Sequence, residues 1–216
     1  MRARKILVAL VATLVAVPGF AIETPELTVG AGYHMLGQTD ASYDFPIGGM
    51  QYGTLNIRDS VAYTAAIAVP LKSQSGARFE VRYSYQPTLV QFETTQDTDL
   101  FDMDVHTLVG GFFMDKVGPG STVVPYGGIS LGATMYDPDA DYASETLFTF
   151  TATAGVTKYT SEKMGLTMRA DLLMPIDWSG GSVWVGTGGG GVGLAGTSYF
   201  TQIALSAGLT FRLGGK

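Results

Sequence analysis

The chain has 216 residues, no cysteine and a formal net charge of −6. Without cysteine there is no disulfide framework, thiolate metal site, cysteine nucleophile or lipoprotein anchor, and the acidic balance disfavours nucleic acid as a partner. Charged residues make up 15% of the chain, against about 25% in ordinary soluble domains, so the composition does not suit a surface that faces water everywhere.

The first residues have the features of a secretory signal peptide. Arg2, Arg4 and Lys5 precede an apolar run at positions 6–17, and small residues follow up to Ala21. A membrane-spanning helix needs ~20 apolar residues, so this run is too short for a retained anchor. We therefore expect residues 1–21 to be removed and residues 22–216 to form the mature domain.

The mature sequence shows the two-residue hydrophobic period of β-strands and no convincing amphipathic helix. All-β barrels of about this length commonly form one domain. We expect eight strands, near 27–36, 60–71, 78–86, 103–114, 122–136, 145–159, 166–174 and 198–213.

The chemistry of the two strand faces indicates which face meets lipid. In the segment 145–159, Phe148 and Phe150 alternate with Thr149 and Thr151. A solvated face would be rich in charged residues, whereas small neutral polar side chains suit the tightly filled lumen of a membrane barrel. We therefore expect the apolar face to point outward into lipid.

The connections between these segments alternate in length. Long loops on one rim and tight turns on the other are typical of outer-membrane barrels, whose long loops face the cell exterior. The sequence thus predicts an all-β, eight-stranded antiparallel up-and-down transmembrane β-barrel in the cell outer membrane, with both termini at the periplasmic rim. The long connections are 37–59, 87–102, 137–144 and 175–197, and the short ones are 72–77, 115–121 and 160–165.

Two motifs resemble a known group of small outer-membrane barrels. The sequence GLTFRL at 208–213 resembles the closing strand of OmpA-type barrels, although Leu213 replaces the usual final Phe. The sequence PYGGISLGA at 125–133 is similar to a strand of the OmpA/OmpW/opacity-protein group. In that group the outer-membrane assembly machinery reads the last strand. The resemblance therefore implies a terminal assembly signal at Gly208, Phe211 and Leu213.

The same resemblance implies a range of roles, because the group includes structural barrels, adhesins, narrow channels and some lipid-modifying enzymes. We expect a non-enzymatic barrel with a structural or surface-interaction role. Its expected partners are outer-membrane lipid and lipopolysaccharide, the assembly machinery and an unidentified envelope protein. A narrow channel for small solutes is one alternative, and a lipid-modifying enzyme that uses His34 or His106 is another. Because the chain ends at Lys216, we expect no periplasmic domain.

Charged residues on the polar faces predict an ion-pair network inside the barrel. The third and seventh strands lie across from each other in an eight-stranded barrel, and an interior of this size is only wide enough for side chains to fill it. Opposite charges from the two strands can therefore meet, and the fourth strand adds an acid and a histidine. We assign this network to Glu80, Arg82, Asp104, His106, Arg169 and Asp171.

The long connections are strongly acidic, with 11 acidic residues against the single base Arg58. Asp137, Asp139 and Asp141 are similar to the first ligands of a calcium loop, but Tyr142 stands where that loop requires glycine. We therefore expect a solvated acidic rim and no metal or other cofactor.

Overall fold

The computed structural model describes residues 24–35, 38–45, 49–71, 76–93, 97–116, 120–139, 143–176, 184–187, 190–193 and 201–214. The expected signal peptide, residues 1–21, lies outside these ranges. Among the described residues there is no helix long and apolar enough to cross a membrane.

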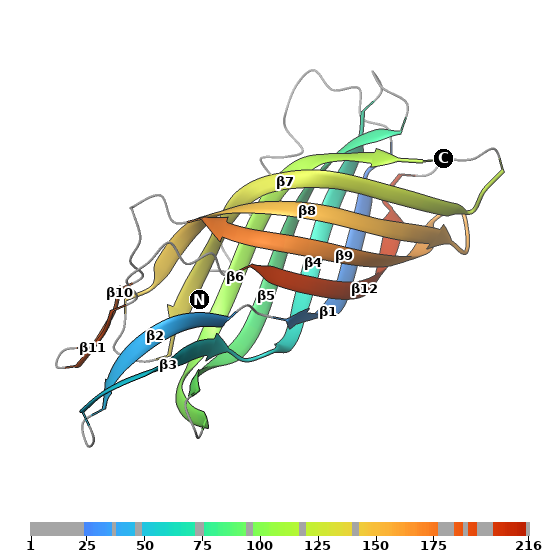
Figure 1. Ribbon diagram of the computed structural model, residues 1–216. Coiled ribbons are helices and arrows are strands. Elements are labelled where there is room, and N and C mark those ends of the chain that lie inside the picture. The colour runs from blue at the N-terminus through green and yellow to red at the C-terminus, as the bar shows by residue number, and fades with distance from the viewer. Residues whose placement is uncertain are drawn as a thin grey trace.

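Eight antiparallel strands close into a barrel (Figure 1). Each strand pairs with its neighbours around the ring, and the first barrel strand pairs with both the second and the last. The predicted eight-stranded up-and-down barrel is therefore confirmed. Its strands are β1 (Glu26–Met35), β4 (Ser60–Pro70), β5 (Ala77–Glu93), β6 (Asp97–Asp115), β7 (Val123–Pro138), β8 (Glu145–Tyr159), β9 (Met164–Ile176) and β12 (Gln202–Arg212).

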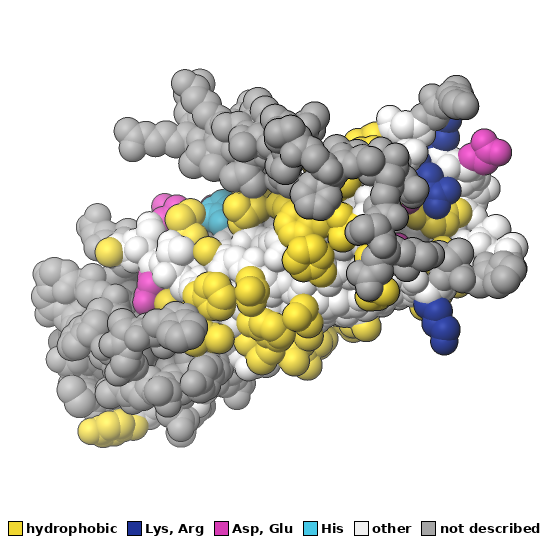
Figure 2. Space-filling view, turned by 90° about the horizontal axis from the view of Figure 1, so that it is seen from above, with side chains coloured by type: hydrophobic (Ala, Val, Ile, Leu, Met, Phe, Trp, Pro, Cys, Tyr) yellow, Lys and Arg dark blue, Asp and Glu magenta, His cyan; other side chains and the backbone are white. Residues whose placement is uncertain are grey.

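The barrel wall is apolar outside and polar inside. On β8, Thr149 and Thr151 are fully buried, whereas on β9 the alternate residues Leu166 and Met168 are 51% and 64% exposed. Hydrophobic side chains gather over the middle of the wall, and lysine and arginine side chains lie toward one end (Figure 2). This arrangement is that of a membrane barrel, because a water-soluble barrel places its apolar face inward.

The second long connection, 87–102, contains more strand than the sequence predicted. Strands β5 and β6 continue past the expected ends of the wall and pair with each other up to Glu93 and Asp97. Pro87 weakened the strand signal there, because proline cannot donate a ladder hydrogen bond. Beyond it, Val90 and Phe92 are 2% and 1% exposed, so burial of apolar side chains maintains the strand.

Short strands add to this extension of the sheet. Strand β2 (Gln38–Phe45) forms a hairpin with β3 (Gly49–Ile57), and β3 pairs with the distal part of β5. Strands β10 (Trp184–Thr187) and β11 (Gly190–Gly193) form a second hairpin, which meets β2. The first and fourth connections, expected as loops, thus contribute strands to the same sheet.

Small residues line the inside of the wall where the barrel closes. Gly30 on β1 lies directly across from Gly208 on β12. A Cβ atom at Gly30 would overlap the backbone carbonyl of Ala207, so only glycine permits this close approach. The neighbouring strand β4 turns Ala66 and Ala68 inward, where both are buried. This side of the lumen therefore leaves room for long side chains from elsewhere.

Candidate functional site

Strands β5 and β9 occupy opposite sides of the ring of strands. The two-residue period of each strand directs every second side chain inward, and charged residues occupy several of these inward positions. The side chains of Glu80, Arg82, Arg169 and Asp171 are only 5–7% exposed. These four charges are therefore desolvated inside the lumen.

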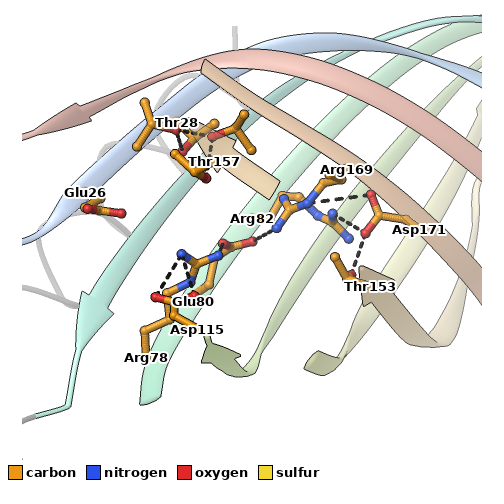
Figure 3. Close-up of polar contacts among 12 residues, drawn as sticks. Glu26, Thr28, Arg78, Glu80, Arg82, Asp115, Thr153, Thr157, Arg169 and Asp171 are labelled. Atoms are coloured by element: carbon orange, nitrogen blue, oxygen red, sulfur yellow. Dashed lines mark hydrogen bonds and ion pairs between the residues drawn. The ribbon is translucent and has the colours of Figure 1, made fainter. Parts of the chain in front are cut away.

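The four charges form two close ion pairs across the lumen (Figure 3). Arg82 Nη1 donates a hydrogen bond to Asp171 Oδ1 at 2.6 Å, and Arg169 Nη2 donates one to Glu80 Oε1 at 2.6 Å. The hydroxyl of Thr153 also donates to Asp171 Oδ1, at 2.5 Å. Each buried charge thus meets an opposite charge, which offsets part of its desolvation cost.

The ion pairs continue toward the short turns through two residues that the sequence-based network did not include. Arg78 Nη1 lies 3.1 Å from Asp115 Oδ1, and Arg78 Nη2 lies 3.8 Å from Glu80 Oε2. A longer contact of 3.9 Å joins Arg169 Nε to Asp171 Oδ2. We call this chain of six alternating charges the lumen network; it runs through Asp115, Arg78, Glu80, Arg169, Asp171 and Arg82.

Arg78 and Asp115 had detectable signals in the sequence. Arg78 shares the inward face of β5 with Glu80 and Arg82, two and four residues further along the strand. Asp115 was assigned to a turn, but it continues the inward face of β6 two residues after the buried Phe113. Extending that strand by one residue would have placed Asp115 in the lumen.

Asp104 and His106 do not belong to the lumen network, so that part of the prediction is wrong. In the register of β5 and β6, the inward residues Glu80, Arg82 and Ser84 lie across from odd-numbered residues of β6. The even-numbered Asp104 and His106 therefore point outward. The prediction failed on β6 because it assigned the polar face of the strand to the lumen. The inward face of β6 instead carries Val105 and Val109, which are apolar and 2% exposed.

His34, the other histidine considered for catalysis, lies inside the barrel near the long-connection end. It is 4% exposed and faces Gln86 and Gln202. Gln86 Nε2 in turn donates a hydrogen bond to Ser60 Oγ at 2.9 Å. The two histidines are therefore on opposite sides of the barrel wall and do not form a shared site.

Chains of threonine hydroxyls lie inside the barrel on both sides of the lumen network. One chain links three neighbouring strands, with distances of 3.0 and 2.7 Å between successive hydroxyl oxygens. A second chain links four strands, with oxygen–oxygen distances of 2.9, 2.6 and 2.8 Å. A hydroxyl both donates and accepts, so such a chain satisfies buried polar groups without adding charge. The first chain is Thr107, Thr134 and Thr149, and the second is Thr157, Thr167, Thr210 and Thr28.

The space inside the barrel narrows toward the lumen network. At the short-turn end a cavity of about 440 Å³ is lined by residues that include Glu26, Arg78, Asp115 and Arg212. Further in, beside Glu80, the free volume is about 10 Å³, which is room for roughly one water molecule. The described side chains thus leave little free space beside Glu80 and Arg169.

The residues of the expected terminal signal lie at the seam of the barrel. Phe211 points outward between Leu27 and Met164 on the two neighbouring strands. Leu213 follows the strand, is 57% exposed, and donates its backbone N–H to the Pro25 carbonyl at 2.8 Å. The structure thus places the motif on the strand that closes the barrel, while recognition by the assembly machinery stays a prediction.

No group of three or more His, Asp or Glu side chains in the described part of the chain could hold a metal ion. Asp137 and Asp139 are described, but Asp141 lies outside the described residues. Asp137 accepts a hydrogen bond from Ser144 at 2.5 Å.

No family model matches the sequence, and no curated protein matches it. Solved structures do match the fold. Neisserial surface protein A has a TM-score of 0.57 at 13% identity, with 89% of this chain and 99% of that chain covered. Outer membrane protein OprG from Pseudomonas aeruginosa has a TM-score of 0.62 at 9% identity, covering 87% and 96%. Outer membrane protein AlkL has a TM-score of 0.58 at 12% identity, covering 93% and 96%.

Identities this low establish the fold and not the role. The apolar outer wall agrees with that fold, because only a closed barrel can expose strands to lipid without unpaired backbone groups. The chain is thus an integral outer-membrane β-barrel with the fold of small eight-stranded barrels.

Proposed function

We propose that the protein is a closed, non-enzymatic outer-membrane barrel that presents an acidic surface to the cell exterior. The observation that supports this role most directly is the lumen network. Its two central ion pairs, Arg82 with Asp171 and Glu80 with Arg169, join opposite sides of the barrel. Each has a nitrogen–oxygen distance of 2.6 Å. A solute would have to separate these pairs in order to pass.

Separation of the pairs is energetically unfavourable. A buried charge that loses its partner destabilises a protein by about 3–5 kcal/mol, and the lumen beside Glu80 has space for little more than one water. Transient opening for an ion is therefore rare. This argument favours the closed barrel over a narrow channel.

The exterior surface is built on the extension of β5 and β6 beyond the wall. Its apolar side chains Ile57, Val90 and Phe92 are at most 4% exposed, so the extension has a packed interior of its own. The carboxylates of Asp99 and Asp102 are exposed on it. A negative surface attracts cationic partners through long-range electrostatics, and this supports a contact role.

Planar-bilayer recording tests the closed state. We expect the wild-type barrel to show no steady conductance, and a variant with Glu80, Arg82, Arg169 and Asp171 all changed to Ala to show one. Heat-modifiable mobility on a gel serves as the control that the variant still forms a barrel. A large steady conductance in the wild type would contradict the proposal and favour the channel.

Whole cells test the acidic surface. A fluorescent hexalysine probe is expected to bind cells that carry the wild-type barrel, and to bind less when Asp99 and Asp102 are changed to Asn. Salt should weaken the binding, because interactions between exposed charges more than about 8 Å apart are largely screened at physiological ionic strength. Glu162→Gln is the matched control, since Glu162 lies at the short-turn rim. Equal binding by the wild type and by the variant with Asp99→Asn and Asp102→Asn would count against the contact role.

A further inference from the structure

A group of polar and aromatic side chains lies on the outside of the barrel wall, where the rest of the wall is apolar. Tyr83 Oη lies 2.8 Å from His106 Nδ1, and Tyr85 Oη donates a hydrogen bond to Asp104 Oδ1 at 3.0 Å. The Tyr85 ring stacks against His106 with centroids 5.2 Å apart and planes 29° apart. We call these four residues, Tyr83, Tyr85, Asp104 and His106, the outer patch.

The outer patch lies where the apolar belt meets the acidic rim. Toward the short turns, the outward face of β6 continues with Phe112 and Met114, which are 63% and 51% exposed. Toward the long connections, Asp104 lies directly across from Asp137 on β7. Because long connections face the cell exterior in this fold, this boundary lies at the outer-leaflet headgroups. Lipid headgroups are therefore the groups that meet the patch.

The chemistry of the patch discriminates among headgroup components. The side chains of Asp104 and Asp137 would repel a phosphate, which is negative. An ionised carboxylate accepts several hydrogen bonds, and Asp104 accepts one from Tyr85, so capacity for sugar hydroxyls remains. The Tyr85 and His106 rings lie nearly parallel, with planes 29° apart. An aromatic ring has a flat face on which the C–H face of a sugar can stack, and amphipathic Tyr side chains suit this membrane depth.

We propose that the outer patch binds a sugar of the outer-leaflet glycolipid headgroup. The sugar stacks on Tyr85 and His106, and its hydroxyls donate to Asp104. Tyr83 fixes the imidazole orientation through its hydrogen bond to Nδ1. This binding site is on the lipid side of the wall, so it is independent of the lumen and of the acidic extracellular surface.

A titration of the purified barrel in phosphatidylcholine nanodiscs with rough lipopolysaccharide tests the proposal. The test variant is the double change Tyr85→Leu with His106→Leu. The control is the double change Tyr33→Leu with Phe112→Leu, which removes two exposed outward rings elsewhere on the wall. We expect the test variant to bind about fivefold to tenfold more weakly than the wild type, and the control to bind as the wild type does.

Three results would overturn the proposal. They are unchanged affinity in the test variant, an equal loss in the control, and wild-type binding of phosphatidylglycerol as tight as that of lipopolysaccharide. If the leucine variant fails to form a heat-modifiable barrel, Tyr85→Phe replaces it. That change keeps the ring and removes the hydrogen bond to Asp104, so we expect a smaller but measurable loss of affinity; no loss would count against the carboxylate's role.

Discussion

Arg82 and Asp171 are 89 residues apart in the sequence, yet their side chains meet in the lumen at 2.6 Å. They come from β5 and β9 on opposite sides of the barrel, and their side chains are 6% and 5% exposed. The pair thus ties the two halves of the wall together through its interior.

Asp171→Ala should lower the free energy of unfolding by about 3–5 kcal/mol, because it leaves Arg82 buried without its closest partner. Urea unfolding in phosphatidylcholine liposomes, followed by gel mobility, would measure the change. The exchange of the two residues, Arg82→Asp with Asp171→Arg, should restore part of the lost stability. Lys158→Ala, at an exposed position on β8, is the control and should cost little. If the variant with the two residues exchanged is no more stable than Asp171→Ala, a direct pairing of Arg82 with Asp171 is refuted.

Ala154→Arg should destabilise the barrel by about 2–4 kcal/mol, since an outward arginine near the bilayer midplane is poorly solvated. Ala154 is exposed on the outer face of β8. Lys158→Arg, on the same face toward the short-turn rim, keeps the charge and should change stability by about 0–1 kcal/mol. The same urea titration in liposomes compares them, and similar values for both would show that Ala154 does not face lipid.

Gly132→Ala should cost about 1–3 kcal/mol, because overpacking forces backbone or side-chain shifts. Its added Cβ would overlap the Leu108 carbonyl oxygen on the neighbouring strand. Gly127→Ala on the same strand should be tolerated, since its Cβ would lie 3.5 Å from the nearest atom, the Thr153 carbonyl oxygen. The midpoint of thermal unfolding in detergent distinguishes the two. An unchanged midpoint for Gly132→Ala would argue against the close approach of β6 and β7.

Removal of residues 208–216 should abolish membrane assembly. Strand β12 pairs with β1 and β9, so its truncation exposes unpaired backbone groups of both neighbours to lipid. Cell fractionation should find the shortened protein degraded or in the periplasm. Removal of residues 215–216 alone, beyond the strand, should leave a heat-modifiable outer-membrane band. An assembled barrel from the longer truncation would contradict the role of the closing strand.

The number of barrel strands and the direction of most of their side chains could be predicted from the sequence, because a barrel with lipid outside and a filled lumen enforces a strict two-residue period. Thr149 and Phe148 show this alternation directly. The period fails as a guide where both faces of a strand mix polar and apolar groups. On β6 the apolar Val105 lies inside and the charged Asp104 lies outside, and only the register with β5 settles their orientation.

The strands beyond the barrel wall are harder to predict for a different reason. Outside the membrane no lipid enforces alternation, and turn-forming residues such as Pro87 interrupt the pattern. The pairing of β3 with the distal part of β5 joins segments that are distant in sequence. Such pairing depends on long-range packing around Phe92, which no local signal reports.

The small inward residues of β4, β1 and β12 limit how the barrel can respond to changes in its lumen. When a long side chain in the lumen is replaced by a short one, Gly30, Gly208 and Ala66 are too short to fill the space that is left. If Arg82 and Asp171 were both replaced by residues with short side chains, water would occupy the gap, and the backbone would need no rearrangement. In this scaffold, therefore, a sealed barrel and an aqueous pore are separated by only a few side-chain changes.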